Sequence, residues 1–295
     1  MDFSKLKGKI FFNKKFIESN KANIHVLNHS LHFASSIFEG IRVYNGKILF
    51  LKDHVKRLIN SSKIMRLKLN ISDDKICKIC LKLVKLNNIK NGYLRPIVFR
   101  SSHSMSPETV NCKTFIAIAC WEWGNLFNKN KGVSLDISRY PKLNRSIYPI
   151  EAKSSGSYQT SVISRIESAK KNFDDCLMLD LDKNIAESSA CNVFWVKSDR
   201  VYTPKKHSIL DGITRNAVIK ICKNNKIKLI EGNFKLSNIL NSDSAFLTGT
   251  AAEIQIIKRI KTKRLNTKNS LVSFLKEKFE LLKKDCPSKV INIKY

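Results

Sequence analysis

The chain has 295 residues, of which 43% are hydrophobic, so it is long enough for about two domains with buried cores. Lys and Arg together number 54 and Asp and Glu number 24, which gives a formal net charge of +30. The lysines are spread through nearly every segment and form no long basic block with interleaved aromatic residues. We interpret the charge as composition bias at surface positions, and we expect no nucleic-acid partner.

The sequence also indicates where the protein acts and whether its cysteines form disulfides or a metal site. It contains no apolar run of about 18 residues, so no membrane span is expected. The polar start MDFSKLKGK lacks the apolar stretch of a signal peptide, which favours a cytoplasmic location. The eight scattered cysteines fit reduced, buried thiols better than disulfides. Cys77 and Cys80 form a C-x-x-C within a helical pattern that has no second pair to complete a metal site, so no metal is expected.

Short β-rich runs alternate with amphipathic stretches, which indicates a mixed fold of the α+β class. The first half of the sequence predicts a hairpin at 43–51, helices at 53–65 and about 72–88, and strands at 93–101 and 114–123. The hairpin turns at Asn45-Gly46, and Asp53 is the predicted N-cap of the first helix. A polar, Asn-rich segment at 125–132 predicts a linker between a domain over 1–124 and a larger domain over 133–295.

The second half predicts a strand at 133–140, an irregular stretch to about 157, and a helix over 158–172. A meander of three short strands follows up to about residue 204. Two helices are then expected directly behind a glycine, one after Gly212 and one after Gly249, and a last helix lies beyond about residue 260. The start of each glycine-preceded helix favours an anion, so the two starts could share one phosphate.

Glycine is scarce, with only ten in the chain, so the remaining glycines are expected where a side chain cannot fit. Four of them look like ordinary turns. The other six stand in unusual local sequences, at Gly40, Gly92, Gly124, Gly156, Gly212 and Gly249.

At these segments the chain resembles the branched-chain amino acid aminotransferases, which are fold-type IV pyridoxal-phosphate enzymes. The resemblance runs from about residue 22 to 258 and rests on motifs in the family's order: NHSLHFASSIFEGIRVY, DHVKRL, GYLRP, EAKSSGSYQTS, AESSACNVFWV, LDGITR and LTGTAAEI. It implies an α+β fold with two domains, a small α/β N-terminal domain and a larger pseudo-barrel C-terminal domain that carries the cofactor lysine. The implied cofactor is pyridoxal 5'-phosphate.

The resemblance implies that Lys153 is the Schiff-base lysine, which holds the cofactor aldehyde and moves a proton between the substrate α-carbon and C4′. A lysine suits both tasks because its pKa falls when it is desolvated or close to a cation. Glu187 matches the carboxylate that pairs with the pyridine nitrogen, and Asn192 supports its loop. Tyr158 matches a hydroxyl near the cofactor's phenolic oxygen. Taken alone, these residues are also typical of a loop charge, a turn carboxylate and a core tyrosine.

The resemblance implies further cofactor contacts. The phosphate would be bound by Arg57, by the backbone N–H groups of Ile213 and Thr214 at one predicted helix start, and by Thr250 at the other. Leu210 would pack against the cofactor ring. Alternatively, Arg57 is a charge on a helix surface, and the sequence T-A-A-E that begins at Thr250 is a capping box.

Substrate contacts are implied in the same way. The positions that match the family's side-chain pocket are Phe38, Gly40, Tyr93, Met105 and Trp123, although aromatic residues and Met beside strands are also typical of a core. Arg95 matches a residue that binds substrate carboxylates, and the backbone N–H of Ala251 would contact the α-carboxylate. Phe33 and Leu126 stand where many family members have tyrosines that assist with the distal carboxylate of glutamate.

The resemblance implies transamination between leucine, isoleucine or valine and 2-oxoglutarate by a ping-pong mechanism, in a homodimer or higher homo-oligomer. Two other enzymes of the same fold are the alternatives, a D-amino acid aminotransferase and an aminodeoxychorismate lyase. A basic nucleic-acid-binding protein on this scaffold is the alternative from another class.

Overall fold

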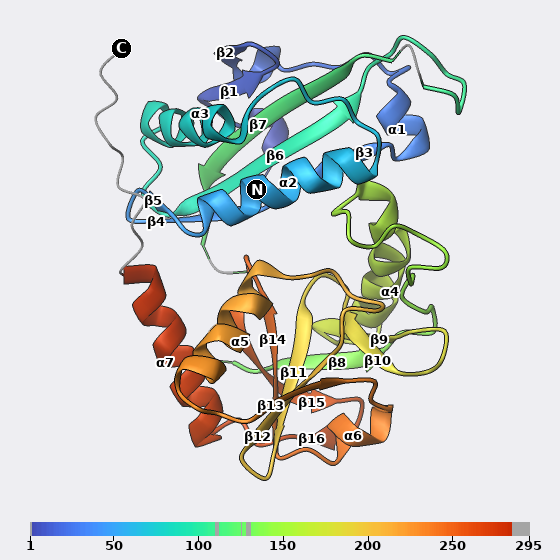
Figure 1. The fold of residues 1–295 in the computed structure, drawn as a ribbon, viewed down its shortest axis with the longest axis vertical. Coiled ribbons are helices and arrows are strands. Elements are labelled where there is room, and N and C mark those ends of the chain that lie inside the picture. Colours follow the sequence, from blue (N-terminus) through green and yellow to red (C-terminus); the bar gives the residue numbers. More distant parts are fainter. Residues whose placement is uncertain (1, 110–111, 125, 128–130, 285–295) are drawn as a thin grey trace. The chain divides into compact units, whose positions relative to one another are not determined.

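The computed structural model describes residues 2–109, 112–124, 126, 127 and 131–284 (Figure 1). In this part the chain forms two compact units, one of residues 2–124 and 152–156 and the other of residues 126–151 and 157–284. Linker residues 125 and 128–130 lie outside the described residues. The segment that carries Lys153 was assigned to the C-terminal domain, but it belongs to the first unit. The physical reason is a β-bridge between Ile37 and Ser154, which ties this segment to the first unit.

The first unit has an antiparallel sheet in the order β2-β1-β7-β6-β4-β5, with β3 also paired to β6. Its strands are β1 (Lys9–Phe12), β2 (Lys15–Glu18), β3 (Ser36–Phe38), β4 (Ile41–Tyr44), β5 (Lys47–Ile48), β6 (Gly92–Arg100) and β7 (Thr114–Glu122). Its helices are α1 (His29–Phe33), α2 (Leu51–Ile64) and α3 (Asp73–Leu86), with 3-10 turns at Phe3–Lys5 and Ser19–Lys21. The predicted hairpin, helices and strands of this half are therefore confirmed.

The two longer helices cover one face of this sheet (Figure 1). Val55 and Leu58 of α2 and Leu83 of α3 share a core cluster with Leu94 and Val98 of β6. Because side chains alternate along a strand, the residues directly before and after each of these two on β6 lie on the opposite face. That second face carries Tyr93, Arg95, Ile97 and Phe99.

Two local details of this unit concern the predicted turn and cap. Asn45 and Gly46 both have positive φ, at 49° and 74°, as a two-residue type I′ hairpin turn requires. The N-cap prediction for Asp53 is wrong, since α2 begins at Leu51 after Phe50, whose φ is 54°. Asp53 instead lies in the first turn, where its charge is favourable near the positive end of the helix dipole.

The second unit is built on a closed ring of strands. Its strands are β8 (Val133–Ile137), β9 (Asp175–Leu179), β10 (Ile185–Ser188), β11 (Asn192–Lys197), β12 (Arg200–Pro204), β13 (Leu229–Gly232), β14 (Ser244–Gly249), β15 (Glu253–Ile260) and β16 (Lys263–Arg264). The pairing order β10-β9-β8-β15-β14-β11 is closed by the additional pairing of β10 with β11, which makes a six-stranded barrel. The pseudo-barrel expectation is confirmed. The predicted meander has four strands, β9 to β12, instead of three.

Four helices surround this barrel in the described residues: α4 (Gln159–Lys170), α5 (Ile213–Asn224), α6 (Leu236–Leu240) and α7 (Ser270–Lys284), with a 3-10 turn at Ser155–Tyr158 before α4. The predicted helix after Gly249 is wrong. Residues 250–252 form a turn, and Gly249 pairs with Glu253 at the start of an antiparallel partner strand. The Ile-rich sequence EIQIIKRI favours a strand because β-branched residues pack well on a pleated surface.

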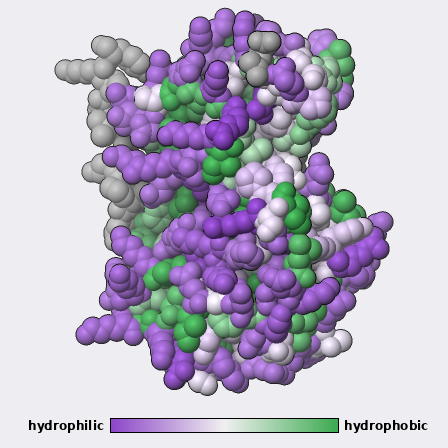
Figure 2. Space-filling view, turned by 45° about the vertical axis from the view of Figure 1, so that its right-hand side comes forward, coloured by the Kyte–Doolittle hydropathy of each residue, from purple (hydrophilic) through white to green (hydrophobic). Residues whose placement is uncertain are grey.

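The surface, the helices and the cysteines indicate whether the chain has features of a membrane protein or a metal protein. Hydrophilic side chains cover most of the visible face in Figure 2, with hydrophobic ones in separate areas. None of the helices in the described ranges is long and apolar enough to cross a membrane. Cys80 is buried in the core under α3, where burial raises the pKa of its thiol, and Cys77 lies half-buried at the edge of that core. The residues that the structure describes contain no His, Cys, Asp and Glu cluster suited to a metal ion.

Candidate active site

Lys153 is held at the end of β3 in the first unit. Its backbone N–H donates to Ser61 Oγ of α2 at 3.0 Å, and its carbonyl oxygen accepts from the Phe38 N–H at 3.0 Å. The ammonium nitrogen of Lys153 lies 4.9 Å from the centre of the Phe38 ring. The lysine is thus anchored through its backbone to two elements, while its side chain lies over an aromatic ring.

Arg57 lies on α2 and is fixed by a buried carboxylate. Glu39 is fully buried, and its Oε1 accepts from Arg57 Nε at 2.6 Å while its Oε2 accepts from Arg57 Nη2 at 2.9 Å. His54 Nδ1 is 2.7 Å from the same Oε2. Burial alone would raise the pKa of the Glu39 carboxyl, but the charges of Arg57 and His54 hold it well below its usual value. Burial lowers the pKa of His54. Arg57 is therefore a positioned cation.

Glu39 and His54 were not among the predicted site residues, although both lie inside the quoted motifs IFEGIR and DHVKRL. His54 and Arg57 are three residues apart on a helix, so they share one face. A search for an acidic residue facing both His54 and Arg57 would have pointed to Glu39.

Most predicted substrate-pocket residues come together on β6 and its neighbours. The Arg95 guanidinium lies 4.8 Å from the Phe38 ring and 5.4 Å from the Tyr93 ring. Trp123 meets Tyr93 edge to face, with ring centres 4.7 Å apart. A Cβ at Gly40 would lie 1.7 Å from the Tyr93 hydroxyl oxygen, so a side chain at residue 40 would displace the Tyr93 ring. These contacts make an aromatic wall with one cation stacked on it.

Met105 lies on the loop after β6 and is 40% exposed. The neighbouring Ser106 carbonyl oxygen is 3.0 Å from His29 Nε2, and the His29 ring lies 4.6 Å from the Phe33 ring. The loop of Met105 therefore adjoins α1. Phe33 and Leu126, the two departures from the family pattern, are 43% and 39% exposed and belong to different units.

Glu187 lies at the end of β10 in the second unit and is 4% exposed. Its Oε2 accepts from Asn192 Nδ2 at 2.9 Å and from the Leu210 N–H at 3.3 Å. Asn192 Nδ2 also donates to the Leu210 carbonyl at 3.0 Å, so it joins the strand to the loop that carries Leu210. The carboxylate is thus oriented by neutral donors on one oxygen.

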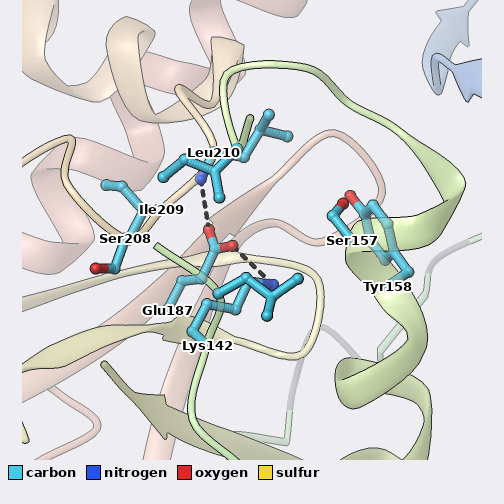
Figure 3. A pocket seen from close by; sticks show the side chains of 9 residues that line it. Lys142, Ser157, Tyr158, Glu187, Ser208, Ile209 and Leu210 are labelled. Atoms are coloured by element: carbon cyan, nitrogen blue, oxygen red, sulfur yellow. Dashed lines mark hydrogen bonds and ion pairs between the residues drawn. The ribbon is translucent and has the colours of Figure 1, made fainter. Parts of the chain in front are cut away.

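Its other oxygen bonds a residue that the sequence analysis did not single out. Lys142 Nζ lies 3.0 Å from Glu187 Oε1 inside the unit (Figure 3). Lys142 follows β8 in the stretch expected to be irregular, and no signal distinguishes it among so many lysines. Tyr158, Glu187, Leu210 and Lys142 line one cavity of about 20 Å³, room for about one water molecule.

The start of α5 lies beside the same group. The helix begins at Ile213 after Gly212, and in the described structure no side chain caps it. A Cβ at Gly212 would lie 2.0 Å from Asn192 Oδ1, so glycine is needed for this approach. The first N–H groups of a helix have no partner within it, so those of Ile213 and the buried Thr214 form an anion-binding position.

Thr250 and Ala251 lie in the turn between β14 and β15 instead of at a helix start. Asn192 pairs with Thr248 in the sheet, and a Cβ at Gly249 would lie 2.9 Å from Cys191 Sγ. The turn at Thr250 therefore adjoins the turn before β11. Asn192, the first residue of β11, contacts Leu210 and the start of α5. Thr250 can supply turn donors to an anion, but the helix-dipole argument for it no longer holds.

Comparison with known proteins identifies the family. The family described as "Amino-transferase class IV" matches residues 36–260. The chain belongs to the class IV aminotransferases. It is 37% identical over 252 residues to a probable branched-chain-amino-acid aminotransferase of Rickettsia felis, which covers 85% of this chain and 86% of that protein. It is 32% identical over 265 residues to the branched-chain-amino-acid aminotransferase of Pseudomonas aeruginosa, covering 88% and 86%.

The fold agrees with solved members of the family. A branched-chain amino acid aminotransferase from T.th., solved with pyridoxamine 5'-phosphate, superposes with a TM-score of 0.91. The two are 28% identical, and the alignment covers 96% of each chain. The fold prediction and the pyridoxal phosphate prediction for this class IV aminotransferase are therefore confirmed.

The residues of this aminotransferase fit such a cofactor chemically. A phosphate dianion matches the positioned guanidinium of Arg57 and the uncapped start of α5. A protonated ring nitrogen matches the buried carboxylate of Glu187, and an aldehyde matches the amine of Lys153. Each part of the cofactor thus has a complementary group in this chain.

Proposed function

We propose that this class IV aminotransferase transfers the amino group between leucine, isoleucine or valine and 2-oxoglutarate in a ping-pong cycle. One observation carries the proposal. The ring of Phe38 has the Lys153 ammonium 4.9 Å away and the Arg95 guanidinium 4.8 Å away. One aromatic surface thus bears both an amine and a planar donor fork. Such a surface suits an apolar side chain in one half-reaction and a second carboxylate in the other.

Pyridoxal phosphate, when bound, supplies an aldehyde and a ring that withdraws electrons from the substrate α-carbon. In the proposal, Lys153 binds the aldehyde and then moves a proton between the α-carbon and C4′. Glu187 holds the ring nitrogen in its protonated form, and the Tyr158 hydroxyl donates to the phenolic oxygen. Leu210 packs on the ring.

The remaining contacts bind the anionic groups of the cofactor and the substrate. Arg57, the N–H groups of Ile213 and Thr214, and the turn at Thr250 bind the phosphate. The N–H of Ala251 contacts the substrate α-carboxylate. This assignment gives the cofactor phosphate and the substrate α-carboxylate named donors.

Recognition of glutamate depends on Arg95 in this proposal. Phe33 and Leu126 have no hydroxyl to assist with a distal carboxylate. Arg95 therefore supplies the main charge-assisted hydrogen bonds to that group.

We also propose that the enzyme works as a homodimer. A hollow of about 370 Å³ on the second face of the first unit is lined by Arg95, Ile97 and Phe99 of β6 and by Ile24 and Leu31. Large apolar side chains beside it are exposed, namely Ile24, Val26, Leu27, Leu31 and Phe33. A second copy of the chain would cover these residues and bury their apolar surface.

We expect this enzyme to act in the cytoplasm, because the described cysteines form no disulfide and five of them have pKa values raised by burial, which suits a reducing compartment. The substrate assignment is tested with purified enzyme and three substrates: L-leucine and D-alanine, each with 2-oxoglutarate, and aminodeoxychorismate alone. The proposal predicts turnover of L-leucine with 2-oxoglutarate and glutamate as the product. Preferred turnover of D-alanine or of aminodeoxychorismate would contradict it and support the corresponding enzyme of the same fold.

A further inference from the structure

Lys142 is buried inside the second unit, where a lysine is rarely found without a partner. Its ammonium lies 3.0 Å from Glu187 Oε1 and donates to Ser161 Oγ of α4 at 3.1 Å. Its backbone N–H donates to the Leu179 carbonyl of β9 at 2.8 Å, which fixes the start of the side chain. The cation is therefore fixed beside Glu187, as Figure 3 shows.

The groups around this ammonium decide its charge. Glu187 faces it from β10, Tyr158 from the start of α4, with its ring centre 5.7 Å away, and Cys176 from β9. Burial alone would lower the pKa of Lys142, but the negative charge of Glu187 and the further influence of Tyr158 raise it above its usual value. Burial raises the pKa of Cys176 to about 12, so this thiol is neutral at pH 7. Lys142 and Glu187 form a neutral pair.

We propose that Lys142 is a positioning residue that partly offsets the negative charge of Glu187, so that this carboxylate holds the ring nitrogen of the bound cofactor protonated without neutralising the ring's charge completely. The inference rests on the proposed role of Glu187. Without Lys142, the carboxylate would balance the ring's charge completely. With Lys142 present, part of the carboxylate's charge is offset by the ammonium, and the protonated ring withdraws electrons more strongly from the substrate α-carbon.

The geometry agrees with an indirect action of this kind. Lys142 takes Oε1 of Glu187, whereas Asn192 and the Leu210 N–H take Oε2. Each carboxylate oxygen has two lone pairs, so the carboxylate retains acceptor capacity for the ring nitrogen. Lys142 therefore acts through Glu187 and does not replace it.

The test measures the pH midpoint of the visible absorption band of the Lys153-bound cofactor. Removing a cation raises the proton affinity of the nitrogen that links Lys153 to the cofactor, and the band reports the protonation of this nitrogen. For Lys142→Met we expect the midpoint to rise by about one pH unit, the lower end of the shift that a neighbouring charge usually causes. We expect proton removal from the substrate α-carbon to slow about tenfold.

Two further variants separate charge from packing. Lys142→Gln removes the charge but keeps a donor for Glu187, so its midpoint should rise like that of Lys142→Met, and it provides the readout where the methionine variant does not fold. Lys142→Arg keeps the charge and should keep the wild-type midpoint. An unchanged midpoint in the folded neutral variants would overturn the inference, as would an equal rise in Lys142→Arg. Absence of the visible band from the wild type would contradict the proposed function itself.

Discussion

Glu39 and Arg57 form a two-point ion pair in the first unit, with Oε1 2.6 Å from Nε and Oε2 2.9 Å from Nη2. Two parallel hydrogen bonds fix the plane of a guanidinium as well as its position. Because Glu39 is fully buried, its position depends on the core around β3 and β4. The orientation of the proposed phosphate-binding cation is thus set by the fold of this unit.

Glu39→Gln should weaken binding of pyridoxal phosphate by tenfold or more, because Arg57 loses a charged partner that orients it. The variant should also lose roughly 3 kcal/mol of unfolding free energy, as expected when one member of a buried ion pair is removed. The measurements are equilibrium titration of the apoenzyme with cofactor and denaturant unfolding.

Pyridoxal without the phosphate is the matched ligand, and its affinity should change little in Glu39→Gln. Glu18→Gln is the matched variant, since Glu18 pairs with Lys9 at an exposed position and should contribute little. Equal weakening for both ligands would show that Glu39 does not act through the phosphate site.

His54 predicts an acid-sensitive step in stability. Its folded pKa is lowered, first by burial, from a usual value of 6.5. Below pH 6.5 the unfolded chain therefore binds a proton that the folded chain does not, so this contribution is present above pH 6.5 and is lost as the pH falls. The lowered pKa of Glu39 acts in the same direction at lower pH, below its usual value of 4.5.

His54→Gln removes this titration. As the pH falls below 6.5, the unfolding free energy of the wild type should decrease more steeply than that of His54→Gln. His25→Gln changes an exposed histidine and should keep the wild-type slope. Parallel curves for the wild type and His54→Gln would refute the account of this buried group.

Gly40→Ala should impair substrate use without loss of cofactor. The new methyl group would meet the Tyr93 hydroxyl at 1.7 Å, so the ring must leave its place beside Arg95. We expect kcat/KM for L-leucine to fall by tenfold or more, since an overpacked site costs about 1–3 kcal/mol. Gly124→Ala is the control, because nothing lies within 4 Å of its added carbon. Normal kinetics in Gly40→Ala would remove Tyr93 from the proposed pocket.

Arg95→Gln separates the two half-reactions. Loss of a charge-assisted, two-point contact should lower kcat/KM for glutamate and 2-oxoglutarate by roughly 100-fold. Leucine has no distal carboxylate, so its kcat/KM should change by less than about tenfold. Stopped-flow measurement of each half-reaction provides both values, and an equal loss in the two would contradict a specific role in binding the distal carboxylate.

Local signals predicted most of the elements. Asn45-Gly46 indicated the hairpin because both residues tolerate positive φ, and helical spacing indicated α3, whose N-cap in the structure is Ser72. The sequence after Gly249 was misinterpreted because a glycine, a threonine and a glutamate are compatible with a helix start. Gly249 pairs with Glu253 in a hairpin between neighbouring strands, and the β-branched run EIQIIKRI that follows was the local signal for it.

The site was predicted only where a motif carried it. Arg57, Lys153 and Glu187 stood in motifs, and the structure gives each an oriented environment. Lys142 could not be predicted, because its role depends on a carboxylate 45 residues away along the chain that only the barrel brings within 3.0 Å. In a chain with 54 Lys and Arg residues, burial is what distinguishes this lysine, and burial is a property of the fold.

The central claim is that Lys153 holds the cofactor, and one comparison tests it directly. Visible spectra of the wild type and Lys153→Ala are recorded with added pyridoxal phosphate, before and after borohydride. We expect a visible band in the wild type that borohydride converts into a stable covalent linkage, and no such band in the variant. A wild type without the band, or a Lys153→Ala variant that retains it, would contradict the account.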